Sequence, residues 1–125
     1  MTTQRRALGK RGEDAACDFL ARKDYHIVER NWKCSYGEAD IVATEADTLV
    51  FVEVKTRRSV AAGTPVEAVT PKKQQRYLRL AQLYVRRNNI LDKNIRFDVI
   101  SIHDHKNGRA ELNLVKNAFG ESGCL

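Results

Sequence analysis

The chain of 125 residues lacks several features that would each point to a class of protein. It has three cysteines, an odd number with no CxxC pair, which argues against a disulfide framework and a structural zinc site. No apolar run approaches the ~20 residues that a membrane span needs. The N-terminal segment is charged where a signal peptide would be apolar. We therefore expect a cytoplasmic protein that makes no contact with a membrane.

Acidic residues are also fewer than basic ones, 16 against 22, which leaves a formal net charge of +6. An excess of basic charge suits a polyanionic partner, and nucleic acid is the commonest. The alternative is a basic surface that serves only solubility. The length predicts a single domain over residues 1–125 with a modest core, ending in a frayed tail from about residue 118 to 125.

Hydrophobic periodicity and turn residues divide the chain into two helices and five strands. Helices are expected over residues 5–22 and 70–89, and strands over residues 25–33, 38–45, 48–57, 95–103 and 110–119. Thr70 and Pro71 are typical of the start of a helix. The strand at residues 48–57 is apolar on both faces, so we expect it at the centre of a sheet with helices on both sides. The order α-β-β-β-α-β-β predicts an α/β fold.

Three charged residues stand in strands that are otherwise apolar. Side chains alternate across a strand, so Glu53 and Lys55 share one face. A hairpin symmetric about Ala46 and Asp47 would set Asp40 opposite Glu53, with Cβ atoms ~5 Å apart. A shift of one residue in the turn would send Asp40 to the other face. The predicted hairpin register therefore decides whether the three charges converge.

Two neighbouring carboxylates repel each other, and burying them without compensation raises the pKa of one. A divalent cation removes the problem, because Mg²⁺ prefers one or two carboxylates together with waters and substrate phosphates. A nearby lysine would orient or deprotonate the attacking water. Asp40, Glu53 and Lys55 thus form a coherent site for phosphodiester hydrolysis. The alternative is a cross-strand ion pair of Lys55 with one of the two acids.

The segment GEADIVATEADTLVFVEVKTR, residues 37–57, closely resembles the signature of the YraN-like family of uncharacterised bacterial proteins. The resemblance extends to GKRGEDAACDFL, VERNWKCSYGEADIV, VTPKKQQRYLRLAQLYV and IRFDVISI. That family is assigned to the PD-(D/E)XK nuclease superfamily, which includes archaeal Holliday-junction resolvases. The resemblance implies a restriction-endonuclease-like α-β-β-β-α-β core, with a mixed central sheet flanked by helices and an extra C-terminal hairpin strand.

The resemblance also implies an endonuclease that uses Mg²⁺ or Mn²⁺ and acts on DNA, with branched or damaged DNA as candidate substrates. Asp40 matches the first acid of the motif, and Glu53-Val54-Lys55 matches the (D/E)XK element, although Ala39 replaces the usual proline. Asp40 and Glu53 would hold the metal. Glu13, which periodicity alone leaves as a border acid reaching solvent, would assist them. Resolvases of this fold usually act as dimers, so a homodimer is a further expectation.

The second expected helix adds Gln74, which with Leu78 fits a Q-x-x-x-(Y/L) element of related nucleases. Gln74 would orient a ligand or the lysine, and the alternative is an amide satisfied by nearby backbone. Basic residues expected to contact the nucleic-acid backbone are Arg5, Arg6, Lys10, Arg11, Arg57, Arg58, Lys72, Lys73 and Arg76. Such contacts supply affinity without reading sequence. For each of these residues, the alternative is a solvated surface position.

Two aromatic residues are further candidates for contact with nucleic acid. Trp32 and Tyr36 would suit stacking on a base, and the alternative is that they cap a core.

Two functions other than an endonuclease stay open. One is a nucleic-acid-binding module that keeps the nuclease fold without cleavage. The other is an adaptor whose basic helix binds a protein partner.

Overall fold

The structure is a computed structural model that describes residues 2–57, 69–90, 92–104 and 110–119; the side chains of residues 2–11, Arg57 and Asp104 lie outside the description. The described residues form two helices and five strands in the predicted order. The elements are α1 (Thr2–Arg22), β1 (His26–Cys34), β2 (Gly37–Glu45), β3 (Thr48–Arg57), α2 (Pro71–Arg87), β4 (Asn94–Asp104) and β5 (Ala110–Val115). Thr64, Pro65 and Glu67 resemble the start of a short helical turn in the sequence, and they lie outside the described residues.

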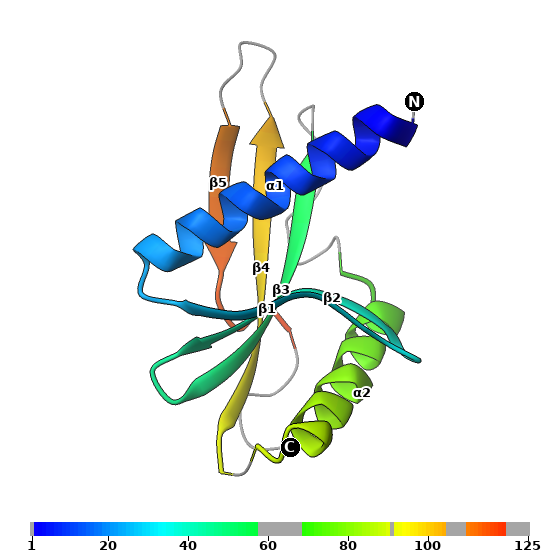
Figure 1. The fold of residues 1–125 in the computed structure, drawn as a ribbon, viewed down its shortest axis with the longest axis vertical. Helices are drawn as coiled ribbons and strands as arrows, with labels where there is room; N and C mark the ends of the chain where they lie inside the picture. Colours follow the sequence, from blue (N-terminus) through cyan, green and yellow to red (C-terminus); the bar gives the residue numbers. More distant parts are fainter. Residues whose placement is uncertain (1, 58–68, 91, 105–109, 120–125) are drawn as a thin grey trace.

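The five described strands form one sheet in the order β1-β2-β3-β4-β5 (Figure 1). Neighbouring strands run antiparallel except β3 and β4, which run parallel. A parallel pair needs a long connection, and α2 lies in the chain between these two strands. The predicted mixed α/β sheet with its central β3 is therefore confirmed.

The register of the β2–β3 hairpin is the one that the sequence predicts. Glu45 pairs with Thr48, and the pairing continues in step as far as Ile41 with Val52. The tight turn contains Ala46, which has a φ angle of +52°. Continuing the register by one residue sets Asp40 opposite Glu53. The hairpin therefore brings the two predicted acids to the same place at its open end.

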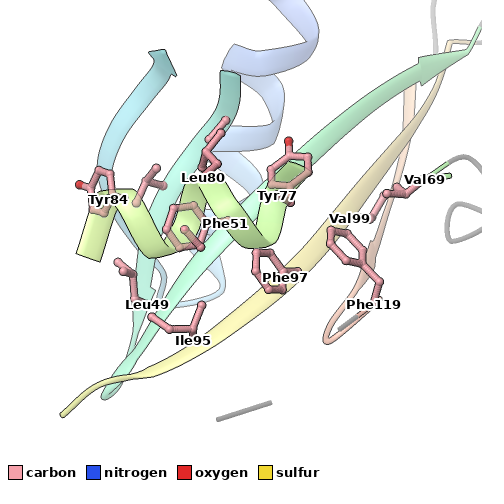
Figure 2. Packing of buried hydrophobic residues seen from close by; sticks show 13 residues of the cluster. Leu49, Phe51, Val69, Tyr77, Leu80, Tyr84, Ile95, Phe97, Val99 and Phe119 are labelled. Carbon is pink, nitrogen blue, oxygen red and sulfur yellow. The ribbon is translucent and has the colours of Figure 1, made fainter. Parts of the chain in front are cut away.

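Each helix covers a different face of the sheet. On one face α1 contributes Ala16 and Leu20, which pack with Val50, Val52 and Ile100 of the central strands. On the other face α2 buries the apolar stripe that periodicity predicts (Figure 2). The buried residues of this stripe are Tyr77, Leu80, Ala81 and Tyr84. The site must therefore lie where one of these two cores ends.

The start of α2 confirms the predicted capping. The Thr70 hydroxyl accepts a hydrogen bond from the backbone N–H of Lys73 at 3.2 Å, and Pro71 occupies the first turn. An N-cap fixes the residue at which a helix starts. The buried stripe of α2 then sets which side chains turn toward β3.

The C-terminal end differs from the prediction. The last strand stops at Val115, where a strand to residue 119 was expected. The Ala118 N–H donates to the Phe97 carbonyl at 2.8 Å, and the Phe119 ring stacks on Phe97 at 5.0 Å between ring centroids. Apolar burial thus holds residues 118 and 119 against the core. Residues 120–125 lie outside the description.

Helix α1 crosses the far end of β3 at close range. A Cβ atom on Gly12 would lie only 2.7 Å from Oγ1 of Thr56, so a larger residue would require this side chain or the helix to shift. The absence of that Cβ atom brings the following residue, Glu13, near the end of the central strand.

No helix in the described part of the chain is long and apolar enough to cross a membrane.

Candidate functional site

The site is built at the open end of the β2–β3 hairpin, where main-chain pairing gives way to side-chain contacts. Beyond Ile41 and Val52, the N–H of Val54 donates to Oδ2 of Asp40 at 2.8 Å. The Asp40 carboxylate thus takes up a backbone donor of the neighbouring strand. This contact ties the acid to β3 beside Glu53.

Glu53 is the most enclosed acid of the site, with only 4 % of its surface exposed. Two side chains of α2 bind its two oxygens: the Lys73 ammonium donates to Oε1, and the Tyr77 hydroxyl donates to Oε2. The Lys55 ammonium lies 3.3 Å from the same Oε1 atom. Lys73 and Tyr77 are four residues apart, so they lie on one face of the helix one turn apart. Together they fix the position of the carboxylate.

The environment drives the pKa values of the two acids apart. Burial, and after it the negative charge of Glu53, raise the pKa of Asp40 to about 7. Burial also acts to raise the pKa of Glu53, but the hydrogen bonds from Lys73 and Tyr77 and the nearby lysine charges hold it below its usual value. One acid is therefore a stable carboxylate, and the other gains and loses a proton near neutral pH.

The lysines of the site also differ from each other. Burial, followed by the neighbouring Lys73 ammonium, lowers the pKa of Lys55. Burial opposes the charge of Lys73 as well, but its hydrogen bond to Glu53 outweighs this and raises the pKa of Lys73. Lys73 is thus the lysine of the two that holds its proton more firmly. Lys55 is the lysine that releases a proton more readily.

Glu13 is held by β1. The Asn31 side-chain amide donates to Oε2 of Glu13 at 3.0 Å, and the Arg30 guanidinium lies 3.6 Å from the same atom. The charge of Glu13 still acts to raise the pKa of Asp40, so the two groups belong to one electrostatic neighbourhood. Among the described residues, however, no three acidic, histidine or cysteine side chains gather as a ligand set. The structure therefore brings together Asp40 and Glu53 but not all three predicted ligands.

Gln74 points away from the acids. Its amide donates to the carbonyl of Val69 at 3.0 Å, which satisfies it on the backbone that precedes α2. The side chain that reaches Glu53 is the preceding residue, Lys73, which the sequence assigned to phosphate. This contact is the backbone-satisfied amide that the sequence offered as the alternative, and the expected role of Gln74 in orienting a ligand or Lys55 stays a prediction. Lys73 and Tyr77 are the α2 side chains that bind Glu53.

The remaining basic residues of the prediction divide into two groups. Lys72 and Arg76 are exposed on α2. Arg58 lies outside the described residues, and so do the side chains of the others, although their backbone belongs to α1 or β3. This second group comprises Arg5, Arg6, Lys10, Arg11 and Arg57. The expected backbone contacts of both groups stay predictions.

The donor set of the site fits a divalent cation of the magnesium type. Asp40 and Glu53 offer hard carboxylate oxygens, which Mg²⁺ and Mn²⁺ prefer over nitrogen or sulfur ligands. The raised pKa of Asp40 shows that the pair repels, and a bound cation would relieve that repulsion. Because Lys73 already binds Oε1 of Glu53, a metal on that atom would replace or share the contact.

The sequence interpretation assigned Tyr77 only to the apolar face of α2, and it missed a second polar cluster. Asp98 of β4 is fully buried, and its oxygens accept hydrogen bonds from the Tyr25 hydroxyl at 2.7 Å and from Nε of Arg96 at 2.9 Å. Arg96 also bonds Glu45 at 2.7 Å, and the Asn117 N–H donates to Asp98 at 2.9 Å. An acid inside the apolar run IRFDVISI was the available signal.

Comparisons with known proteins agree with one another. Residues 12–102 match the family described as uncharacterised protein family UPF0102. A UPF0102 protein of Caldicellulosiruptor saccharolyticus is 46% identical over 116 residues, which cover 92% of this chain and 98% of the relative. A UPF0102 protein of Geobacter sulfurreducens is 47% identical over 112 residues, covering 90% of this chain and 88% of the relative. Both relatives are bacterial and align along nearly their whole length.

Proposed function

The chain belongs to the uncharacterised protein family UPF0102, and we propose that it is a metal-dependent endonuclease of the PD-(D/E)XK type that hydrolyses phosphodiester bonds in DNA. One observation carries the proposal. Asp40, Glu53 and Lys55 converge at the end of one hairpin, and each has the environment that its role requires. The mixed sheet flanked by helices supports it, because it agrees with the core that the superfamily resemblance implies.

Asp40 and Glu53 would hold the metal, Mg²⁺ or Mn²⁺. When bound, the cation supplies an activated water and stabilises charge on the reacting phosphate. Glu13, held by Asn31 and Arg30, contributes negative charge beside Asp40 and is the assisting acid of the proposal. Lys73 and Tyr77 are positioning residues, since they orient the Glu53 carboxylate from α2.

Lys55 is the residue that would handle the attacking water. Its ammonium lies 3.3 Å from Oε1 of Glu53, so it reaches the place where the carboxylates meet. A lysine with a lowered pKa gives up a proton more easily and is a better general base near neutral pH. In its protonated form the same group stabilises negative charge that develops on phosphate. The alternative prediction, a purely structural ion pair, gives no reason for a second acid beside it.

Cleavage of labelled DNA tests the proposal. Wild-type protein with Mg²⁺ or Mn²⁺ is incubated with duplex, single-stranded, flap and four-way-junction DNA, beside Asp40→Asn and Glu53→Gln. We expect cleavage of at least one substrate by the wild type and its loss in both variants. Asp18→Asn, which changes an exposed acid on α1, is the matched control and should cleave normally.

The same assay separates the other candidate functions. Binding without cleavage of every substrate would contradict the nuclease and favour a nucleic-acid-binding module. Cleavage that survives both substitutions would show that the hydrolytic site lies elsewhere. A protein that neither binds nor cleaves DNA would leave the adaptor as the remaining candidate.

A further inference from the structure

The turn between β1 and β2 carries an exposed aromatic residue, Tyr36, and the residue that follows it packs against a basic side chain of α2. Tyr36 in this turn is 40% exposed. The next residue, Gly37, has a φ angle of +134°, which residues other than glycine rarely adopt. A Cβ atom on Gly37 would lie 3.5 Å from both Cδ and Nε of Arg76, so the turn rests directly against this side chain of α2. Figure 1 shows the tip of the β1–β2 hairpin beside the first part of α2.

Both side chains are available to a ligand. Neither Tyr36 nor Arg76 forms a hydrogen bond or ion pair with any described residue, and Arg76 is exposed. The other aromatic of this hairpin behaves differently. Trp32 packs edge-on against Tyr84 at 5.0 Å between ring centroids, and thus belongs to the core on the α2 face. Of the two uses that the sequence left open for these aromatics, Trp32 takes the core position, whereas Tyr36 stays exposed.

Tyr36 and Arg76 lie close to the acidic site formed by Asp40 and Glu53. Tyr36 is connected to it along β2, and Arg76 along α2. Gly37 precedes Asp40 by three residues of β2, which is about 10 Å along an extended strand. Arg76 follows Lys73 by three residues of α2, and Lys73 binds Glu53. A distance of about 10 Å corresponds to roughly three nucleotide steps of a DNA strand. One DNA strand can therefore reach the acids and the turn together.

We propose that Tyr36 and Arg76 form a docking surface for an unpaired nucleotide near the scissile phosphate. Tyr36 stacks on the base, and the Arg76 guanidinium binds the adjacent phosphate. A base must leave its duplex partner to stack on such a ring. The inference rests on the proposed nuclease function and adds its substrate class, which is DNA with single-stranded character beside the cleavage site. The position of Tyr36 and Arg76 close to the proposed hydrolytic site favours a nucleic-acid strand over a protein partner.

Binding to two DNAs of matched sequence tests the inference. Fluorescence anisotropy compares a splayed fork with the fully paired duplex, in Ca²⁺ so that binding is measured without turnover. We expect Tyr36→Ala to weaken fork binding about tenfold and to leave duplex binding nearly unchanged. Tyr36→Trp should keep fork binding, because it keeps the stacking surface. Arg76→Gln should weaken fork binding and reduce its dependence on salt.

Val28→Ala provides the matched control, since Val28 is an exposed apolar residue of the same hairpin at the other end of β1. Equal weakening of fork and duplex by Tyr36→Ala would overturn the stacking role, and so would normal fork binding by this variant. Either result would leave the acidic site standing. Failure of the wild type to bind both DNAs would overturn the docking surface together with the proposed action on DNA. A thermal melt of each variant confirms that it is folded.

Discussion

Two acids are buried in the neighbouring central strands, Glu53 in β3 and Asp98 in β4, and they lie on opposite faces of the sheet. Each accepts a hydrogen bond from a tyrosine and has a basic side chain beside it. The difference lies in what accompanies them. The Arg96 guanidinium and the backbone N–H of Asn117 bind Asp98 and compensate its negative charge. Glu53 has a second acid beside it and two lysines around it.

This contrast separates a structural ion cluster from the cluster that we propose to be hydrolytic. In the Asp98 cluster, consisting of Tyr25, Glu45, Arg96, Asp98 and Lys116, opposite charges are matched pairwise. In the acidic site, Asp40 has no ammonium or guanidinium group bound to it in the described structure, and its pKa is raised to about 7. Buried acids with such raised pKa values cluster at functional sites, where a bound ligand can compensate their charge.

The largest effect is expected on catalysis from Lys55→Ala. Removing the proposed water-handling group should reduce single-turnover DNA cleavage by about 10²- to 10⁴-fold. The control, Lys116→Ala, removes a lysine that bonds the other cluster through Glu45 and should cleave at the wild-type rate. Equal rates for Lys55→Ala and wild type would remove Lys55 from the reaction.

On the structural side, Asp98→Ala is expected to cost about 3 kcal/mol in the free energy of unfolding. The substitution leaves Arg96 and the Tyr25 hydroxyl without their shared acceptor in a buried position. Urea denaturation followed by circular dichroism measures the loss. Asp18→Ala, at an exposed position, should change stability by less than about 0.5 kcal/mol. A similarly small loss for Asp98→Ala would contradict the structural role.

The dependence of stability on pH should carry opposite signs in the two regions. Asp40 has a raised pKa, so the folded protein keeps a proton that the unfolded chain releases, and stability falls as pH rises from about 4 to about 7. Asp40→Asn removes this fall. The measurement is urea denaturation across that pH range in EDTA. An unchanged pH profile in Asp40→Asn would show that the acids do not conflict.

The smallest expected effect comes from Glu45 in the Asp98 cluster. Although partial burial acts against it, hydrogen bonds from Lys116 and Arg96 lower the pKa of Glu45. Its contribution to stability is therefore present above its ordinary pKa near 4.5 and is lost as the pH falls through the lowered value. Glu45→Gln should be less stable than wild type at pH 7, and the difference should shrink below pH 4. A constant difference across this range would contradict the assignment.

The hairpin register was predictable because it depends on local signals. The tight turn at Ala46 and the alternation along β3 fix each other, since a shift of one residue would turn Asp40 to the face of the sheet opposite Glu53. The N-cap at Thr70 was similarly readable from two adjacent residues. Both predictions were confirmed, and together they placed Asp40, Glu53 and α2 in contact.

The details of α2 and β4 were not predictable by the same means. Adjacent helix residues differ by about 100° in direction, so periodicity could not decide whether Lys73 or Gln74 faces the acids. The choice depends on how closely α2 packs on β3. Asp98 was visible as an acid in an apolar strand, but its partner Tyr25 lies 73 residues away in the sequence. Only the folded chain brings them together.

Binding of Mn²⁺ tests the central claim most directly, because it requires no knowledge of the substrate. Isothermal titration calorimetry would compare wild type with Asp40→Asn and with Asp98→Asn, for folded protein only. We predict one Mn²⁺ site in the wild type and in Asp98→Asn, and at least about tenfold weaker binding in Asp40→Asn. Equal Mn²⁺ binding by wild type and Asp40→Asn, or no binding by the wild type, would contradict a metal site at Asp40 and Glu53.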